Sequence, residues 1–220
     1  MEDGISGNYE FTIGGLISEA WQRTKGAKLT INLAVIIYMV IVIGFNILMQ
    51  VVMRSTGSIG LILVLQLVFA FVNLVFGMGM FMIGLRFAIG AEASVSQLFS
   101  CFGRSLHIFL CLILMYLMIL LGFILLIIPG IYLGLAYYLA MPLVVEKKMP
   151  VWKAMETSRK AITKRWFSVF GLLFVLGFIN LIAAIPVGIG LIWTLPMSVI
   201  CFSMLYRNIF GYEQSTLEAA

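Results

Sequence analysis

Four long runs without a charged side chain dominate this sequence and limit what it can fold into. The runs cover residues 29–53, 59–85, 105–145 and 167–206. A helix needs about 20 apolar residues to cross the hydrocarbon core of a bilayer, so each of the first two runs fits one span and each of the last two fits two. Charged residues make up 10% of the chain, against about 25% in soluble domains. The sequence therefore predicts an all-α, polytopic membrane protein with six transmembrane helices.

The predicted spans pair as three hairpins, at about residues 29–86, 105–145 and 167–206. Residues 54–58 form a polar turn in the first hairpin. In the second hairpin Pro129 precedes Gly130, and this pair is typical of turns. Pro186 marks the third reversal. Each hairpin is therefore predicted to return the chain to the side of the membrane on which it began.

An amphipathic segment precedes each hairpin. These segments lie at about residues 11–25, 94–103 and 150–166, the first of them after a polar N-terminus over residues 1–10. Apolar residues recur in them at helical spacing, which predicts short helices lying in the membrane interface. The repeated layout indicates a threefold internal repeat whose units run parallel, related about the membrane normal. Residues 1–220 are predicted to form a single transmembrane domain.

The most strongly charged segment lies between two apolar runs, over residues 142–166. Pro150 suits the first turn of a helix, in which Met155, Ser158 and Ile162 then share one side. Lys and Arg take the other side, so this helix is predicted to lie in the interface with its cations toward anionic lipid. The alternative is a soluble helix packed on neighbouring loops. The predicted lipid-binding residues are Lys153, Arg159, Lys160, Lys164, Arg165, Trp152 and Trp166.

The positions of the cations predict the orientation of the chain. Of the 14 Lys and Arg residues, only Arg54 falls on the side opposite to the N-terminal segment, the connections between hairpins and the C-terminus. Lys and Arg are enriched on the cytoplasmic side of membranes, so both termini are predicted to be cytoplasmic. The net charge of +5 follows from these orientation signals and does not indicate a nucleic-acid partner.

Part of the sequence resembles a known family. The matching segments are Ile128-Pro-Gly-Ile-Tyr-Leu-Gly134, Pro142-Leu-Val-Val-Glu146, Ala154, Ser158 and Lys164-Arg-Trp166. They are similar to the membrane domain attached to some bacterial glycerophosphodiester phosphodiesterases and to related free-standing membrane proteins. The resemblance covers about residues 90–175 and implies six helices, interfacial connecting helices and a bacterial inner-membrane location. It implies no catalysis, because the phosphodiesterase chemistry of those proteins lies in a separate soluble domain, and it gives Glu146 no role.

Four amide side chains occur within the first predicted hairpin. Asn46 and Gln50 lie one turn apart on its first helix, and Gln66 and Asn73 lie two turns apart on its second. If these helices pack side by side, the four amides share one polar seam. Such groups most often hold helices together, contributing about 0.6 kcal/mol per contact. A polar lining for a transported solute is the alternative.

The sequence offers few groups for catalysis or metal binding. His107 is the sole histidine, and no pattern typical of a hydrolase, a zinc protease or a phosphate-binding loop is present. Met78 with Met82, and His107 with Cys111, share helix faces and would suit Cu(I). However, 14 methionines in an apolar chain are ordinary packing residues. The three cysteines are predicted to be unpaired thiols. We expect no enzyme activity, no metal and no cofactor.

Two functions follow from these features. The first is a non-catalytic inner-membrane protein that contacts anionic lipid headgroups through its cationic interfacial helix and supports envelope or lipid homeostasis. The second is a small transporter or channel for a hydrophobic or weakly polar solute, using the predicted seam. Membrane lipids are the predicted partners, and a protein partner or a second copy of the chain is left open.

Overall fold

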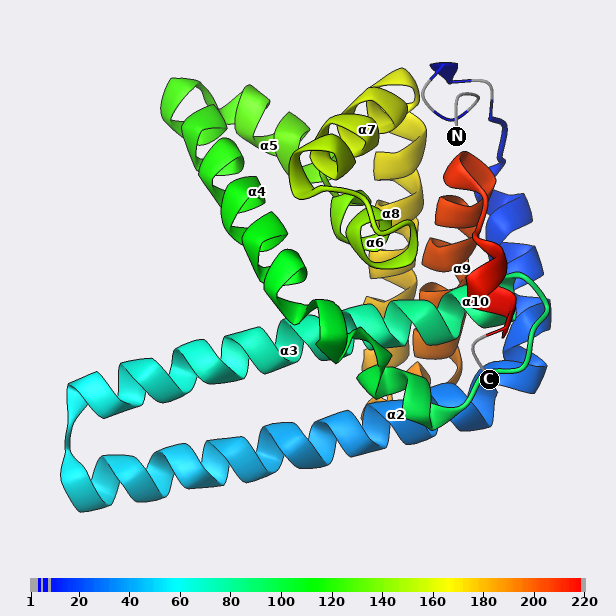
Figure 1. Cartoon of the computed structure of the whole chain (residues 1–220). Helices are drawn as coiled ribbons and strands as arrows, with labels where there is room; N and C mark the ends of the chain where they lie inside the picture. Colours follow the sequence, from blue (N-terminus) through cyan, green and yellow to red (C-terminus); the bar gives the residue numbers. More distant parts are fainter. Residues whose placement is uncertain (1–3, 5, 8, 219–220) are drawn as a thin grey trace.

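The computed structural model describes residue 4, residues 6 and 7, and residues 9–218, and this part of the chain is built from helices without a strand (Figure 1). The rest of the predicted polar N-terminus, residues 1–3, 5 and 8, lies outside the described residues. The elements are α2 (Ile13–Thr56), α3 (Ile59–Ala88), the 3₁₀ helix η1 (Val95–Arg104), α4 (Ser105–Leu125), α5 (Ile127–Ala136), α6 (Ala140–Glu146), α7 (Val151–Lys164), α8 (Trp166–Ala184), α9 (Leu191–Phe210) and α10 (Gln214–Glu218).

Five helical segments of the described chain are long and apolar enough to cross a membrane. They are Ile13–Thr56, Ile59–Ala88, Val95–Leu125, Ile127–Glu146 and Trp166–Ala184. The all-helical, membrane-compatible character predicted from the sequence is therefore confirmed. The predicted sixth span corresponds to α9, which is not among the five. Pro196, Arg207 and Asn208 lower the hydropathy of α9, and half of its residues are buried by protein.

The first amphipathic segment and the first predicted span form one continuous helix, the 44 residues of α2. Thr12 caps its start by accepting a hydrogen bond from the Gly15 N–H, and Gly57 ends it in a left-handed conformation. No proline interrupts the segment between these caps, so the polar residues near Lys25 do not break the helix. Figure 1 shows instead that α2 changes direction: its first turns lie beside α9, and the remainder runs out beside α3.

Helix α9 is the centre of the packed region and contacts α2, α3 and α8. Its Ile200, Met204 and Tyr206 side chains are fully buried. Helix α3 crosses α9 closely at Gly84, where an added Cβ would lie 2.6 Å from the hydroxyl oxygen of Ser203. Tyr206 and Ser203 bring polar atoms into this core, and both hydroxyls donate hydrogen bonds there.

The outer halves of α2 and α3 form an arm, residues 40–70, that leads away from this core (Figure 1). Phe45 and Phe69 stack with their ring centroids 3.9 Å apart and join the two helices. Most apolar side chains of the arm are exposed, including Ile43, Ile47 and Leu67. Water would penalise so much exposed apolar surface, whereas lipid would not.

The second and third reversals of the chain differ in whether the predicted turn residues lie in them. Between α8 and α9 the chain turns over residues 185–190, which include the predicted Pro186, and Gly188 has a positive φ there. Between α4 and α5 the chain reverses at the extended residue Leu126, before Pro129 and Gly130. Proline is tolerated in the first turn of a helix, and Gly130 lets α5 pass close to the Phe123 ring of α4. Both residues therefore belong to the start of α5 and not to the reversal.

Candidate functional site

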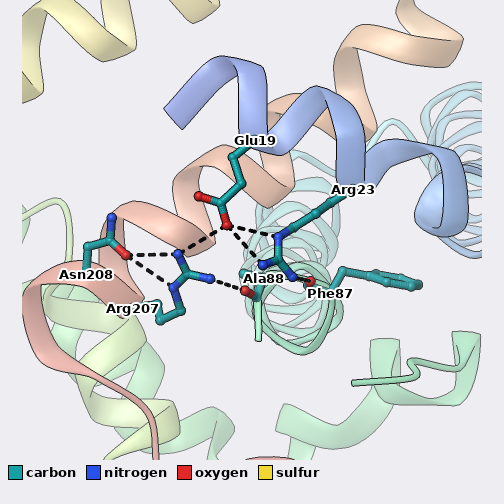
Figure 2. A network of polar contacts seen from close by, with 6 residues as sticks. All are labelled: Glu19, Arg23, Phe87, Ala88, Arg207 and Asn208. Atoms are coloured by element: carbon teal, nitrogen blue, oxygen red, sulfur yellow. Dashed lines mark hydrogen bonds and ion pairs between the residues drawn. The ribbon is translucent and has the colours of Figure 1, made fainter. Parts of the chain in front are cut away.

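Some charged residues of this chain form networks among helix ends, and others are left on the surface. Figure 2 shows one such network, which is partly buried. Glu19 of α2 accepts a hydrogen bond from Arg23 at 3.1 Å and lies 3.5 Å from Arg207 of α9. The two arginines donate to the carbonyls of Phe87 (3.1 Å) and Ala88, respectively, at the C-terminal end of α3. Cations there satisfy carbonyls that the helix leaves free and oppose its dipole.

A second network, which is buried, surrounds Glu146 at the end of α6. Its carboxylate accepts hydrogen bonds from the Tyr206 hydroxyl (2.9 Å), the Glu213 backbone N–H (2.6 Å) and the Thr216 hydroxyl (3.1 Å). The ammonium of Lys147 lies 3.8 Å away, and the Glu146 side chain is completely buried. The network joins α6, α9 and the C-terminal tail. Sequence reasoning missed it because the partners lie 60 to 70 residues apart in the chain.

Helix α7 has the amphipathic form predicted for it. Met155, Ser158 and Ile162 are buried, as are the neighbouring Ala154 and Ala161. Ser158 fixes the helix in place, since its hydroxyl donates to the Ala136 carbonyl (2.7 Å) and accepts from the Leu139 N–H (3.2 Å). The opposite face of α7 is therefore directed away from the protein.

That outer face carries most of the predicted lipid-binding residues. Lys153, Lys160 and Lys164 are exposed, and Trp152 is 62% exposed. Lys160 pairs with Glu156 at 2.7 Å, and this hydrogen bond lowers the pKa of the Glu156 carboxyl. Lys153 and Lys164 make no ion pair with any acidic residue that the structure describes. These two lysines keep their full capacity to attract an anion.

The two predicted arginines have different surroundings. Arg159 lines a pocket of about 240 Å³ that also includes Tyr137 and Trp152. Arg165 lies 3.7 Å from Glu10 and 5.8 Å from the centre of the Tyr9 ring. Glu10 is highly exposed, so its ion pair with Arg165 is weak.

Tyr9 anchors the N-terminal segment to α7, a contact that sequence reasoning missed. Its hydroxyl donates a 3.0 Å hydrogen bond to the Ala161 carbonyl. Burial raises the pKa of Tyr9 from 10.0 to about 12, although the nearby Arg165 guanidinium opposes the shift. The phenol therefore stays neutral over the physiological pH range.

Trp166, the last predicted lipid-binding residue, marks the corner at which α7 ends and α8 begins. Its indole N–H donates to the Tyr132 carbonyl at 3.4 Å. The Tyr132 hydroxyl lies 2.5 Å from the hydroxyl of Thr163. These contacts hold α5 against the corner, and no local sequence signal marks Tyr132 for this role.

The four amides of the predicted seam are not joined in this structure. Asn46, Gln50 and Gln66 are exposed, and Asn46 donates to the Val42 carbonyl of its own helix at 2.8 Å. Asn73 is half-buried and accepts a hydrogen bond from Tyr38 of α2. No hydrogen bond joins two of these four amides within the described residues.

A different amide links α8 to α9. Asn180 donates to the Ser198 hydroxyl across the two helices at 2.8 Å. Its carbonyl oxygen and the Thr194 hydroxyl are buried without a hydrogen-bond partner. This pair provides the kind of interhelical contact that the sequence places in the first hairpin.

His107 is exposed at the start of α4, and its predicted companion Cys111 is buried with its thiol 3.7 Å from the Met115 sulfur. Among the residues that the structure describes, no three His, Cys, Asp or Glu side chains are placed to hold a metal ion.

No known protein family, no curated protein and no solved structure matches this chain. The geometry of the surface charges is therefore the basis on which a function is inferred.

Proposed function

We propose that this protein is a non-catalytic, six-span protein of the bacterial inner membrane that binds anionic lipid through the outer face of α7. The observation that carries the proposal is the two-sided character of α7. Its inner face is buried against the protein, while Lys153 and Lys164 on its outer face have no acidic partner among the described residues. Helix α9 is the sixth span in this proposal.

The chemistry of the outer face matches the interfacial layer of a membrane. Long lysine side chains place their stems in apolar surroundings and their ammonium groups at headgroup level. Trp152, 62% exposed, lies near the start of α7, and Phe167, 83% exposed, lies just after its end. Trp is enriched at the interfacial depth of membranes. Each cation near an anionic leaflet contributes about 1 kcal/mol. The cations together favour anionic over neutral lipid.

The proposal also assigns the protein an orientation in the membrane and a cellular role. The charged segments near Glu19, Glu146 and Arg207 are joined to neighbouring helix ends by the two networks and face the cytoplasm in this proposal. A protein that recruits anionic lipid without acid–base groups would support envelope or lipid homeostasis. Transport through a lining of amides stays a prediction from the sequence, and no contact of those amides favours it.

Lipid selectivity measured by fluorescence quenching tests the proposal. The protein, with Trp21 and Trp193 replaced by Phe, is reconstituted in bilayers that contain brominated phosphatidylglycerol or brominated phosphatidylcholine. Bromine quenches the remaining Trp152 and Trp166 on contact. We expect stronger quenching by the anionic lipid, and replacement of Lys153, Lys160 and Lys164 by Gln should weaken the preference by about fivefold per cation.

A matched control removes three cations elsewhere. Lys25, Lys28 and Arg54 on α2 are replaced by Gln, which changes the net charge by the same amount. This variant should keep the lipid preference. Equal quenching by both lipids in the unmodified α7 protein would contradict the proposal, as would an equal loss in the α2 control.

A further inference from the structure

The corner between α7 and α8 contains a polar, cationic pocket. It has a volume of about 480 Å³, and its lining includes Thr163, Lys164, Arg165 and Ser168. Two cationic residues and Ser168 thus border one open space, whereas the Thr163 hydroxyl already donates to the Arg159 carbonyl at 2.6 Å. Helix α8 also begins here, at Trp166, without a side-chain cap, and a helix start favours an anion.

An apolar groove lies directly beside this pocket. It has a volume of about 370 Å³ and is lined by Ile128, Ile131, Tyr132, Trp166 and Phe167. The last two residues line the cationic pocket as well. The pocket and the groove are therefore neighbouring parts of one surface, which we call the corner site.

The corner site is held together by contacts that do not use its cations. Tyr132 of α5 is hydrogen-bonded to Thr163 and, through its carbonyl, to the Trp166 indole. These bonds fix the wall between the pocket and the groove. The only acidic residue near the cations within the described chain is Glu10, 3.7 Å from Arg165 and 92% exposed on its side chain. Glu10 can therefore turn toward solvent when another anion arrives.

We propose that the corner site binds one anionic phospholipid. Lys164 and Arg165 hold its phosphate, with Ser168 as a hydrogen-bond donor, and one acyl chain lies in the groove along Ile131. A free phosphate would leave the groove empty, and a neutral lipid would leave two cations without a counter-charge. This inference rests on the proposed function and adds a defined, stoichiometric site to a general preference for anionic lipid.

A protein with a single tryptophan makes the site visible. Of the four tryptophans, Trp21, Trp152 and Trp193 are replaced by Phe, so that Trp166 alone reports. The detergent-solubilised protein is titrated with phosphatidylglycerol carrying brominated chains. We expect saturable quenching at one lipid per protein, counted independently by native mass spectrometry, and at least tenfold weaker binding of brominated phosphatidylcholine.

Substitutions in the pocket and in the groove should act separately. Replacing Lys164 and Arg165 together by Gln should weaken binding by about tenfold or more, whereas Arg165→Lys alone should retain most of the affinity because it keeps the charge. Ile131→Gln places a polar group in the groove and should also weaken binding several-fold. Ile124→Gln, at an exposed position on α4, is the matched control and should change nothing. Circular dichroism confirms that each variant remains helical.

The outcomes separate the corner site from the broader proposal. If the anionic lipid is preferred but Ile131→Gln and the double Gln variant bind like the parent, the general preference stands and the corner site is overturned. If neither lipid is preferred, both proposals fail. If inorganic phosphate displaces the lipid at equal concentration, the site recognises an anion alone and the lipid assignment is overturned.

Discussion

The buried network around Glu146, the partly buried network around Arg207 and the exposed surface of α7 use the same types of charged residue in different ways. The Glu146 carboxylate has three hydrogen-bond donors and is fully buried. Lys153 and Lys164 are exposed and have no acidic partner among the described residues. The Glu146 carboxylate is hydrogen-bonded within the fold, whereas the two lysines remain available to bind other molecules.

In this chain, with 10% charged residues, some charged residues thus stabilise the fold and others remain available to bind a ligand. A buried charge is tolerated only when hydrogen bonds and ion pairs offset the loss of its hydration. Such a group stabilises one arrangement of helices, and the fold would lose stability if the group left its partners to bind a ligand. An exposed lysine contributes little to folding, so it can be replaced with little effect on the fold. Stability and lipid contact should therefore respond to different substitutions.

The largest effect is expected from removing the Glu146 carboxylate. Glu146→Ala leaves three donors without an acceptor and Lys147 without one of its two acidic partners. Breaking a buried charge network from one side costs about 3–5 kcal/mol. Thermal and denaturant unfolding in detergent should show this loss, and Glu146→Gln, which keeps one acceptor oxygen, should lose less.

The matched control is the exposed glutamate of α7. Glu156→Ala removes a carboxylate that pairs only with Lys160 on the surface, so the unfolding free energy should hardly change. A similar loss of stability in the two alanine variants would show that the buried and exposed charges do not differ in role.

The sequence predicts the local features of this fold better than its long-range ones. Helical spacing correctly identifies the buried face of α7. The burial of Met155, Ser158 and Ile162 requires only that α7 is a helix with one side covered by protein. The partners of Glu146 could not be predicted, since Tyr206 and Thr216 reach it only after α9 has packed and the tail has folded back. An acidic residue at the end of an apolar helix, such as Glu146, indicates that it has a hydrogen-bonding partner, but the sequence does not show which residue that partner is.

The differences in the helix boundaries have simple physical reasons. Pro129 is compatible with the first turn of a helix as well as with a turn, and the structure uses it in the helix. A short polar stretch near Lys25 is compatible with a loop or with a helix, and the continuous helix prevails where no proline interrupts it. The predicted lipid-binding residues could be named from charge and spacing alone. The groove beside them could not, because α5 reaches Trp166 only through tertiary contacts.

A smaller effect is expected from the arginine of the network in Figure 2. Arg207→Gln removes one of the two charged donors that link Glu19 to the end of α3. Hydrogen bonds to charged groups contribute about 1.5–3 kcal/mol, and partial exposure places the loss near the lower end of that range, about 1.5 kcal/mol. The unfolding free energy in detergent measures it.

Arg54→Gln is the control for this substitution, because Arg54 is exposed at the far end of the α2–α3 arm. We expect it to leave stability unchanged. If Arg207→Gln also left the unfolding free energy unchanged, the network in Figure 2 would be a surface contact and would belong with the exposed charges.

The smallest effect concerns Tyr9, which lies between the two sets of charges. Tyr9→Phe removes its hydrogen bond to the Ala161 carbonyl and should cost about 1 kcal/mol near neutral pH. Because burial raises the pKa of Tyr9 from 10.0 to about 12, the folded protein favours the neutral phenol. The stabilisation is therefore complete below pH 10 and declines as the pH rises from about 10 to about 12. The difference in unfolding free energy between the parent and Tyr9→Phe, measured from pH 8 to pH 11, should shrink along this course, whereas the same difference for the exposed Tyr212→Phe should start near zero. A difference that stays constant with pH would mean that Tyr9 is as accessible to water as the lysines of α7, and the N-terminal segment would then be no part of the buried set.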